Sequence, residues 1–103
     1  KLRIGCNQTA YSLNGYMDEV SFFNSELTGS DLTAYLSASR GSHIINDLSL
    51  SPVAYYRMGE DDNLTDGQTG ISQITDASGN GHHATQSDVT KQPTASVEPI
   101  IYV

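Results

Sequence analysis

The sequence predicts an all-β protein with one short helix. Two runs, 15–24 (GYMDEVSFFN) and 53–58 (VAYYRM), are rich in the aromatic and β-branched residues that are typical of strands. Between them, residues 26–38 change to the spacing of apolar side chains that is typical of a helix. The stretch 76–83 (DASGNGHH) carries two glycines and one asparagine, which predict tight turns with positive φ.

The first predicted strand, 15–24, has no uniformly apolar face. Successive side chains of a strand point to opposite faces, so one face carries Tyr16, Asp18, Val20 and Phe22. The other face carries Met17, Glu19, Ser21 and Phe23. This mixture indicates a bulge or two partly buried faces. A shorter run, 2–5, is expected to be the end of a preceding strand.

The predicted helix lies within residues 28–38. Its apolar face is formed by Leu27, Leu32, Tyr35 and Leu36. Thr28 and Asp31 have the spacing of a capping box, in which two side chains each satisfy an unpaired backbone N–H. Gly41 is the expected stop, because glycine tolerates the left-handed conformation that ends many helices.

A new pattern begins after Ser51. Pro52 suits the first residue of a strand, because proline cannot donate to a ladder further in, and 53–58 follows as the second predicted strand. Residues 60–70 are expected to form an acidic loop and residues 71–75 a short strand. Residues 91–99, with two prolines, are expected to be an extended linker, and residues 100–103 a β-prone end.

The composition excludes several classes of partner. Five Lys and Arg against twelve Asp and Glu give a net charge of −7, which argues against binding nucleic acid or anionic membranes. Acidic clusters do suit hard cations such as Ca²⁺. No apolar run approaches the roughly 20 residues of a membrane span, so no membrane insertion is expected. Cys6 is the only cysteine, which rules out a disulfide within the chain.

Two segments resemble laminin-G-like modules of the concanavalin A-like lectin/glucanase superfamily. The run 15–24, followed by Glu26-Leu27-Thr28 and Asp31-Leu32, is similar to the closing strand and short helix of such modules, and Leu2-Arg3-Ile4-Gly5 is similar to the strand before it. The run 53–60, followed by DASGNGHHAT at 76–85, is similar to their opening. The resemblance implies jelly-roll β-sandwich elements.

The order of the two resemblances is reversed, since the closing pattern precedes the opening pattern. This order fits either the seam between tandem modules or a circular permutant, and we favour tandem modules because they are far commoner. The expected division is 1–40 as the C-terminal part of a first module, 41–51 as a connector, 52–90 as the N-terminal part of a second module and 91–103 as an extended linker or tail. Similar modules occur in marine bacteriophage virion or tail-fibre proteins and in secreted bacterial adhesins.

The resemblance also implies a calcium site that joins first and last strands. Its candidate metal ligands here are Asp18 and Asp76, one from each module. Each would therefore lack its natural partner within this chain. The alternative role of Asp76 is to cap its turn by accepting backbone N–H bonds.

The other polar residues indicate no catalytic centre. Asp18 and Glu19 are adjacent, so in a strand they face opposite ways and do not form a glycosidase carboxylate pair. The acidic loop is expected to be exposed; it is not an EF-hand, because Ser72 stands where the final Glu belongs. The pair His82-His83 is expected to be solvated in its turn. Tyr16, Tyr55 and Tyr56 are expected in the core rather than as sugar-stacking platforms.

We therefore expect no enzyme but a structural and carbohydrate-binding module of a phage virion, tail fibre or surface appendage. The alternatives are a secreted bacterial adhesin or enzyme accessory module, and a glycoside hydrolase on the same fold. Expected partners are other virion or surface proteins, host glycans and further copies of the chain in a homo-oligomer, at a virion or extracellular location. Residues expected to pack partly against segments outside the chain are Phe22, Leu32, Leu36, Val53 and Tyr55.

Overall fold

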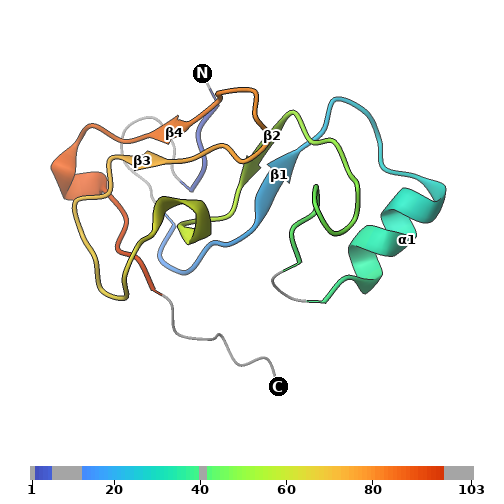
Figure 1. The fold of residues 1–103 in the computed structure, drawn as a ribbon. Helices are drawn as coiled ribbons and strands as arrows, with labels where there is room; N and C mark the ends of the chain where they lie inside the picture. Colours follow the sequence, from blue (N-terminus) through green and yellow to red (C-terminus); the bar gives the residue numbers. More distant parts are fainter. Residues whose placement is uncertain (1, 6–12, 40–41, 97–103) are drawn as a thin grey trace.

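Short strands dominate the fold, with one helix to one side (Figure 1). The computed structural model describes residues 2–5, 13–39 and 42–96. Its elements are β1 (Val20–Phe22), α1 (Gly29–Ser37), β2 (Ala54–Tyr56), β3 (Gln73–Ile74) and β4 (Ala84–Thr85), with two 3₁₀ turns, η1 (Glu60–Asp62) and η2 (Val89–Lys91). These two small antiparallel sheets with one helix are compatible with the mainly-β prediction. Cys6, the expected helix stop Gly41 and the β-prone end 100–103 lie outside the described residues.

The two predicted strands pair with each other. β1 and β2 are antiparallel, with Val20 opposite Tyr56 and Phe22 opposite Ala54. The N–H of Val53 donates to the carbonyl of Phe22 at 2.7 Å and extends the ladder by one bond. The segment similar to a module's closing strand therefore lies directly beside the segment similar to an opening strand.

β1 is much shorter than the predicted strand 15–24, and Glu19 is the reason. Its φ of +50° lies in the left-handed region, which costs a non-glycine residue about 1 kcal/mol or more. The extended backbone is interrupted there, so the strand begins only at Val20. The expectation that Asp18 and Glu19 alternate across a strand is wrong, because neither belongs to one.

β3 and β4 form a second two-stranded antiparallel sheet, in which Gln73 lies opposite Thr85 and Ile74 opposite Ala84. An isolated bridge between Tyr56 and Asp76 connects this sheet to β2. The N–H of Ala77 also donates to the carbonyl of Tyr55 at 2.7 Å. β2 thus stands between β1 and the turn that follows β3.

A small core covers one side of β2. Tyr55 is fully buried, and Ile44 and Leu50 from the turn before β2 pack against it. Partly buried residues complete this core: Phe23, Leu27, Ile45, Leu48 and Ala77. The expectation that Tyr55 packs against residues outside the chain is wrong, because the turn 43–50 folds back over its ring.

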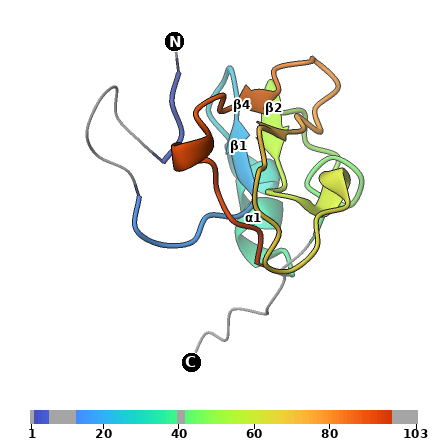
Figure 2. The same cartoon turned by 90° about the vertical axis from the view of Figure 1, so that its left-hand side faces the viewer.

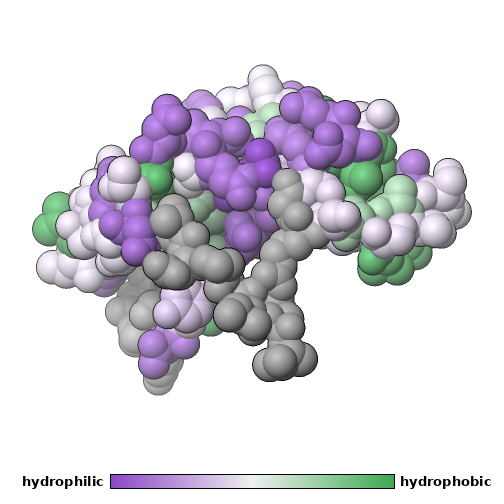
Figure 3. All heavy atoms as spheres, turned by 60° about the horizontal axis from the view of Figure 1, so that its bottom comes forward, coloured by the Kyte–Doolittle hydropathy of each residue, from purple (hydrophilic) through white to green (hydrophobic). Residues whose placement is uncertain are grey.

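The position of α1 agrees with the prediction, but the predicted capping box does not form. Thr28 is the N-cap residue, yet its side chain makes no capping hydrogen bond. No residue of α1 is buried, and Leu36 is 74% exposed. Figure 3 shows hydrophobic side chains on the surface at the end of the molecule where α1 lies. The apolar face of the helix is therefore left uncovered by the described residues.

The acidic loop 60–70 and the described part of the expected linker 91–99 are both hydrogen-bonded to other parts of the chain. Asp62 accepts hydrogen bonds from the backbone N–H and the hydroxyl of Thr75. Ala95 and the loop exchange two backbone bonds, from Gly67 N to Ala95 O at 2.8 Å and from Ala95 N to Gln68 O at 2.9 Å. None of the helices in the described residues is long and apolar enough to cross a membrane.

Candidate functional site

Asp76 is the buried organiser of the turn at 76–83. Oδ1 accepts from the N–H groups of Tyr55 and Ser78, each at 2.9 Å. Oδ2 accepts from the Ser78 hydroxyl at 2.8 Å and the His82 N–H at 2.9 Å. A carboxylate has about four lone-pair sites, and all four are occupied. The structure therefore gives Asp76 the turn-capping role.

The same hydrogen bonds dominate the electrostatics of Asp76. Its side chain is 4% exposed, and burial alone would raise its pKa. The donors from Ser78, Tyr55 and His82 outweigh burial and lower the pKa to about 2. The carboxylate is therefore ionised at neutral pH and held in place by donors that all belong to this chain.

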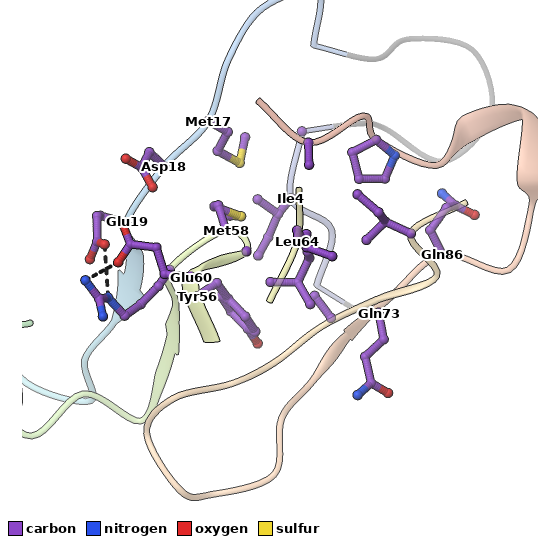
Figure 4. A pocket seen from close by; sticks show the side chains of 18 of the residues that line it. Ile4, Met17, Asp18, Glu19, Tyr56, Met58, Glu60, Leu64, Gln73 and Gln86 are labelled. Atoms are coloured by element: carbon purple, nitrogen blue, oxygen red, sulfur yellow. Dashed lines mark hydrogen bonds and ion pairs between the residues drawn. The ribbon is translucent and has the colours of Figure 1, made fainter. Parts of the chain in front are cut away.

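Asp18 has a different environment. It is exposed and lies near Glu19 and Glu60 at the edge of a groove (Figure 4). The described residues contain no group of three or more His, Cys, Asp or Glu side chains that could hold a metal ion. Asp76 could ligate calcium only by giving up hydrogen bonds, whereas Asp18 is exposed.

Sequence reasoning missed a polar network that joins β1 to β2. Glu19 accepts a hydrogen bond from the Tyr55 hydroxyl and one from Arg57 Nε at 3.1 Å. Arg57 also pairs with Glu60. The sequence does place one acid, Glu19, and one base, Arg57, in two runs that are both predicted as strands. Whether the two side chains come into contact depends on the register in which these strands pair, which the sequence does not show.

Burial and neighbouring charge shift the pKa values in this network. Burial raises the pKa of the Tyr55 hydroxyl, and its hydrogen bond to Glu19 adds to that rise. Burial also raises the pKa of Glu60; Arg57 opposes this rise, and Glu19, Asp18 and Asp61 add to it. Among the described residues that act on Glu60, the negative charges therefore outnumber the one arginine.

A large groove opens beside this acidic corner. Its volume is about 2400 Å³. Figure 4 shows side chains from several segments around it: Ile4, Met17, Tyr56, Met58 and Leu64. In Figure 2 the segment 2–5, in blue, stands to one side of the β1–β2 pair. The apolar surface on the Tyr56 side of β2 is thus not closed as the Tyr55 side is.

The three tyrosines considered as sugar platforms separate into two groups. Tyr55 and Tyr56 are buried, as predicted for core residues. Tyr16 is 77% exposed and lines the groove, so the core prediction is wrong for this residue. Tyr16 belongs to the segment 13–19, which precedes β1 and is not a strand. A prediction based on the alternation of side chains in a strand therefore does not apply to it.

The histidines serve local structure. His83 Nδ1 accepts the N–H of Asp76 at 3.0 Å, while the side chains of His82 and His83 are exposed as predicted for a solvated pair. His43 Nδ1 accepts the N–H of Asn46 at 3.2 Å, and its ring lies edge-on to Tyr55. Neither arrangement places a histidine beside a free nucleophile in the described residues.

Comparison of the chain with protein-family models, with curated proteins and with solved structures finds no match.

Proposed function

We propose that the chain is a non-catalytic structural and carbohydrate-binding module of a virion fibre, tail or surface appendage, built from jelly-roll sandwich elements. The pairing of β1 with β2 supports the structural part, because the two segments that resemble a closing and an opening strand lie side by side. The module acts outside cells in a homo-oligomer. A secreted adhesin or enzyme accessory module would use the same surfaces.

One observation carries the non-catalytic part: the best-placed carboxylates hold the fold together. Asp76 accepts four hydrogen bonds, and Glu19 is bound by Tyr55 and Arg57. A glycosidase needs one carboxyl group free to donate a proton and a second free to attack or to activate water. Carboxylates saturated by donors of their own chain are poorly suited to both tasks.

The carbohydrate-binding part rests on Tyr16. An exposed aromatic ring gives a flat apolar surface with a polar hydroxyl at its edge, which suits the mixed character of a sugar. Asp18 and Asn14 lie within two residues of it, line the same groove and can accept hydrogen bonds from sugar hydroxyls.

The test is a panel of soluble polysaccharides, assayed for both binding and the release of reducing ends. We expect binding without turnover, and Tyr16→Ala to weaken binding about ten-fold, a change of about 1.4 kcal/mol. Leu36→Ala is the control, because Leu36 is about as exposed as Tyr16 but lies on α1 and is not among the residues that line the groove. Turnover that is lost in a folded Glu19→Gln variant would refute the non-catalytic assignment.

A further inference from the structure

The groove beside Met17 and Met58 is too large for a small ligand. Pockets for small molecules measure roughly 300–1,000 Å³, whereas this groove measures about 2400 Å³. Its walls include apolar side chains from segments far apart in the sequence: Ile4, Met17, Met58, Leu64 and Ile71. A space of this size with apolar stretches in its wall is suited to the side chains of a polypeptide.

Along one rim of the groove, the backbone groups have no backbone partner among the described residues. Residues 14–17 line the groove and make no backbone hydrogen bonds with the described parts of the chain. Unpaired N–H and C=O groups along a rim can accept an added strand, whose alternate side chains then enter the adjoining space. The rim therefore favours an extended segment over a helix.

The acidic corner sets the charge of that segment. Three carboxylates that line the groove, Asp18, Glu19 and Glu60, surround one base, Arg57. The nearby Asp61 adds further negative charge. A lysine or arginine brought to this corner would be attracted, and an acidic residue would be repelled.

We infer that the groove binds an extended polypeptide segment that has apolar side chains on one face and a lysine or arginine at the end that meets Asp18 and Glu60. This inference rests on the structural half of the proposed function and names the chemistry of the partner. A second copy of this chain is the weaker fit, because it brings a net charge of −7 and the same acidic corner.

The probe is a pair of labelled nine-residue peptides with alternating valine and threonine, one with lysine at both ends and one with glutamate there. Fluorescence anisotropy with the full chain is expected to show at least ten-fold tighter binding of the lysine peptide at low salt. The double variant Asp18→Asn/Glu60→Gln should bring that ratio close to one. The control Asp31→Asn removes a charge from exposed α1 and should leave the ratio unchanged.

Met17→Ser tests the apolar walls without changing the charge of the groove, and with little risk to folding, because Met17 is partly exposed. It should weaken the binding of both peptides about ten-fold, whereas Leu36→Ser, on the exposed face of α1, should weaken neither. Equal binding of the two peptides, or no binding of either, would overturn the inference. So would light scattering that shows a dimer whose formation is blocked by Met17→Ser, because the occupant would then be a second copy.

The two proposals fail separately. If the chain binds sugar but neither peptide, the inferred peptide groove is refuted and the glycan surface at Tyr16 stands. If the chain binds the lysine peptide but no sugar, and Tyr16→Ala still binds that peptide, the carbohydrate part of the proposed function is refuted and the inferred peptide groove stands.

Discussion

The surroundings of Tyr55 and of Leu36 represent two differently built regions of one small chain. Tyr55 is fully buried, while Leu36 is 74% exposed on a helix with no buried residue. Around Tyr55, the chain supplies both the apolar cover and the polar partners. On α1, and at Met17 on the rim of the groove, apolar side chains remain exposed.

The difference lies in where the polar groups are. Asp76 and Glu19 connect the Tyr55 region through hydrogen bonds that span up to 38 residues of sequence. In the described part of the chain, every buried side-chain nitrogen or oxygen has a hydrogen-bond partner. The closed region is therefore self-sufficient in polar contacts, whereas the open surfaces have the character of an interface.

The largest expected effect is that of Asp76→Ala. The change leaves the N–H groups of Tyr55, Ser78 and His82 without their acceptor, and each unsatisfied buried group costs about 1–3 kcal/mol. Because His82 is exposed and can regain water, we expect a loss of about 3 kcal/mol in the free energy of unfolding, measured in urea by circular dichroism.

Asp31→Ala is the matched control for that substitution. Asp31 is exposed in the first turn of α1, where it loses a weak helix-dipole interaction and gains helix propensity. The two effects oppose each other, so the net change should stay within about 0.5 kcal/mol. Equal effects at Asp76 and Asp31 would remove the distinction between the closed and the open region.

Leucine truncation compares the two regions directly. Leu50 is buried against Tyr55, so Leu50→Ala should cost about 2–3 kcal/mol through lost contacts and a cavity. Leu36→Ala should change the free energy of unfolding by less than about 0.5 kcal/mol, because the side chain is already in solvent. A large loss at Leu36 would mean that α1 is covered after all.

The pH dependence tests the Asp76 carboxylate. Its pKa is lowered from 3.8 to about 2 in the folded chain, so the unfolded chain binds the proton more tightly. This contribution is fully present above about pH 4 and is lost as the pH falls through about 2. It amounts to about 2 kcal/mol at 1.36 kcal/mol per unit. In an acid titration, the free energy of unfolding of Asp76→Asn should fall less steeply with decreasing pH than that of the original chain. An identical pH dependence would show that Asp76 does not contribute in this way.

The smallest effect concerns the Tyr55 hydroxyl. Tyr55→Phe removes the donor to Glu19 and a long, 3.4 Å contact from the Ile44 N–H. A loss of about 1 kcal/mol is expected, as for one buried hydrogen bond. Tyr35→Phe, on partly exposed α1, should have no measurable effect in the same urea titration.

Local patterns predicted the elements, and tertiary contacts decided the rest. Helix α1 and strand β2 were predictable, because spacing and β-propensity act within a few residues. The turn-capping role of Asp76 could be considered in advance, since two of its donors lie within six residues. Glu19 could not be placed, because its left-handed backbone and its partners Tyr55 and Arg57 depend on a pairing register that the sequence does not reveal.

The exposed apolar surfaces were predicted only in outline, and the groove was not predicted. Uncovered apolar residues were expected, and Leu32 and Leu36 are indeed exposed. Tyr55 was predicted in a core, but its cover by this chain was not foreseen, because that cover depends on the turn 43–50 folding back across β2. Such a reversal leaves no periodic signal in a segment of mixed polar and apolar residues.

Amide hydrogen exchange of the monomeric chain is the most direct test of the difference between the two regions. The Tyr55 N–H, bound to Asp76, and the Ala77 N–H, bound to Tyr55, should exchange at least about 100-fold more slowly than the amides of α1. Such a gradient would show that the chain closes the Tyr55 side of β2 by itself and leaves α1 weakly protected. Uniform protection across α1 and β2 in a monomer, with one cooperative thermal transition, would contradict the account.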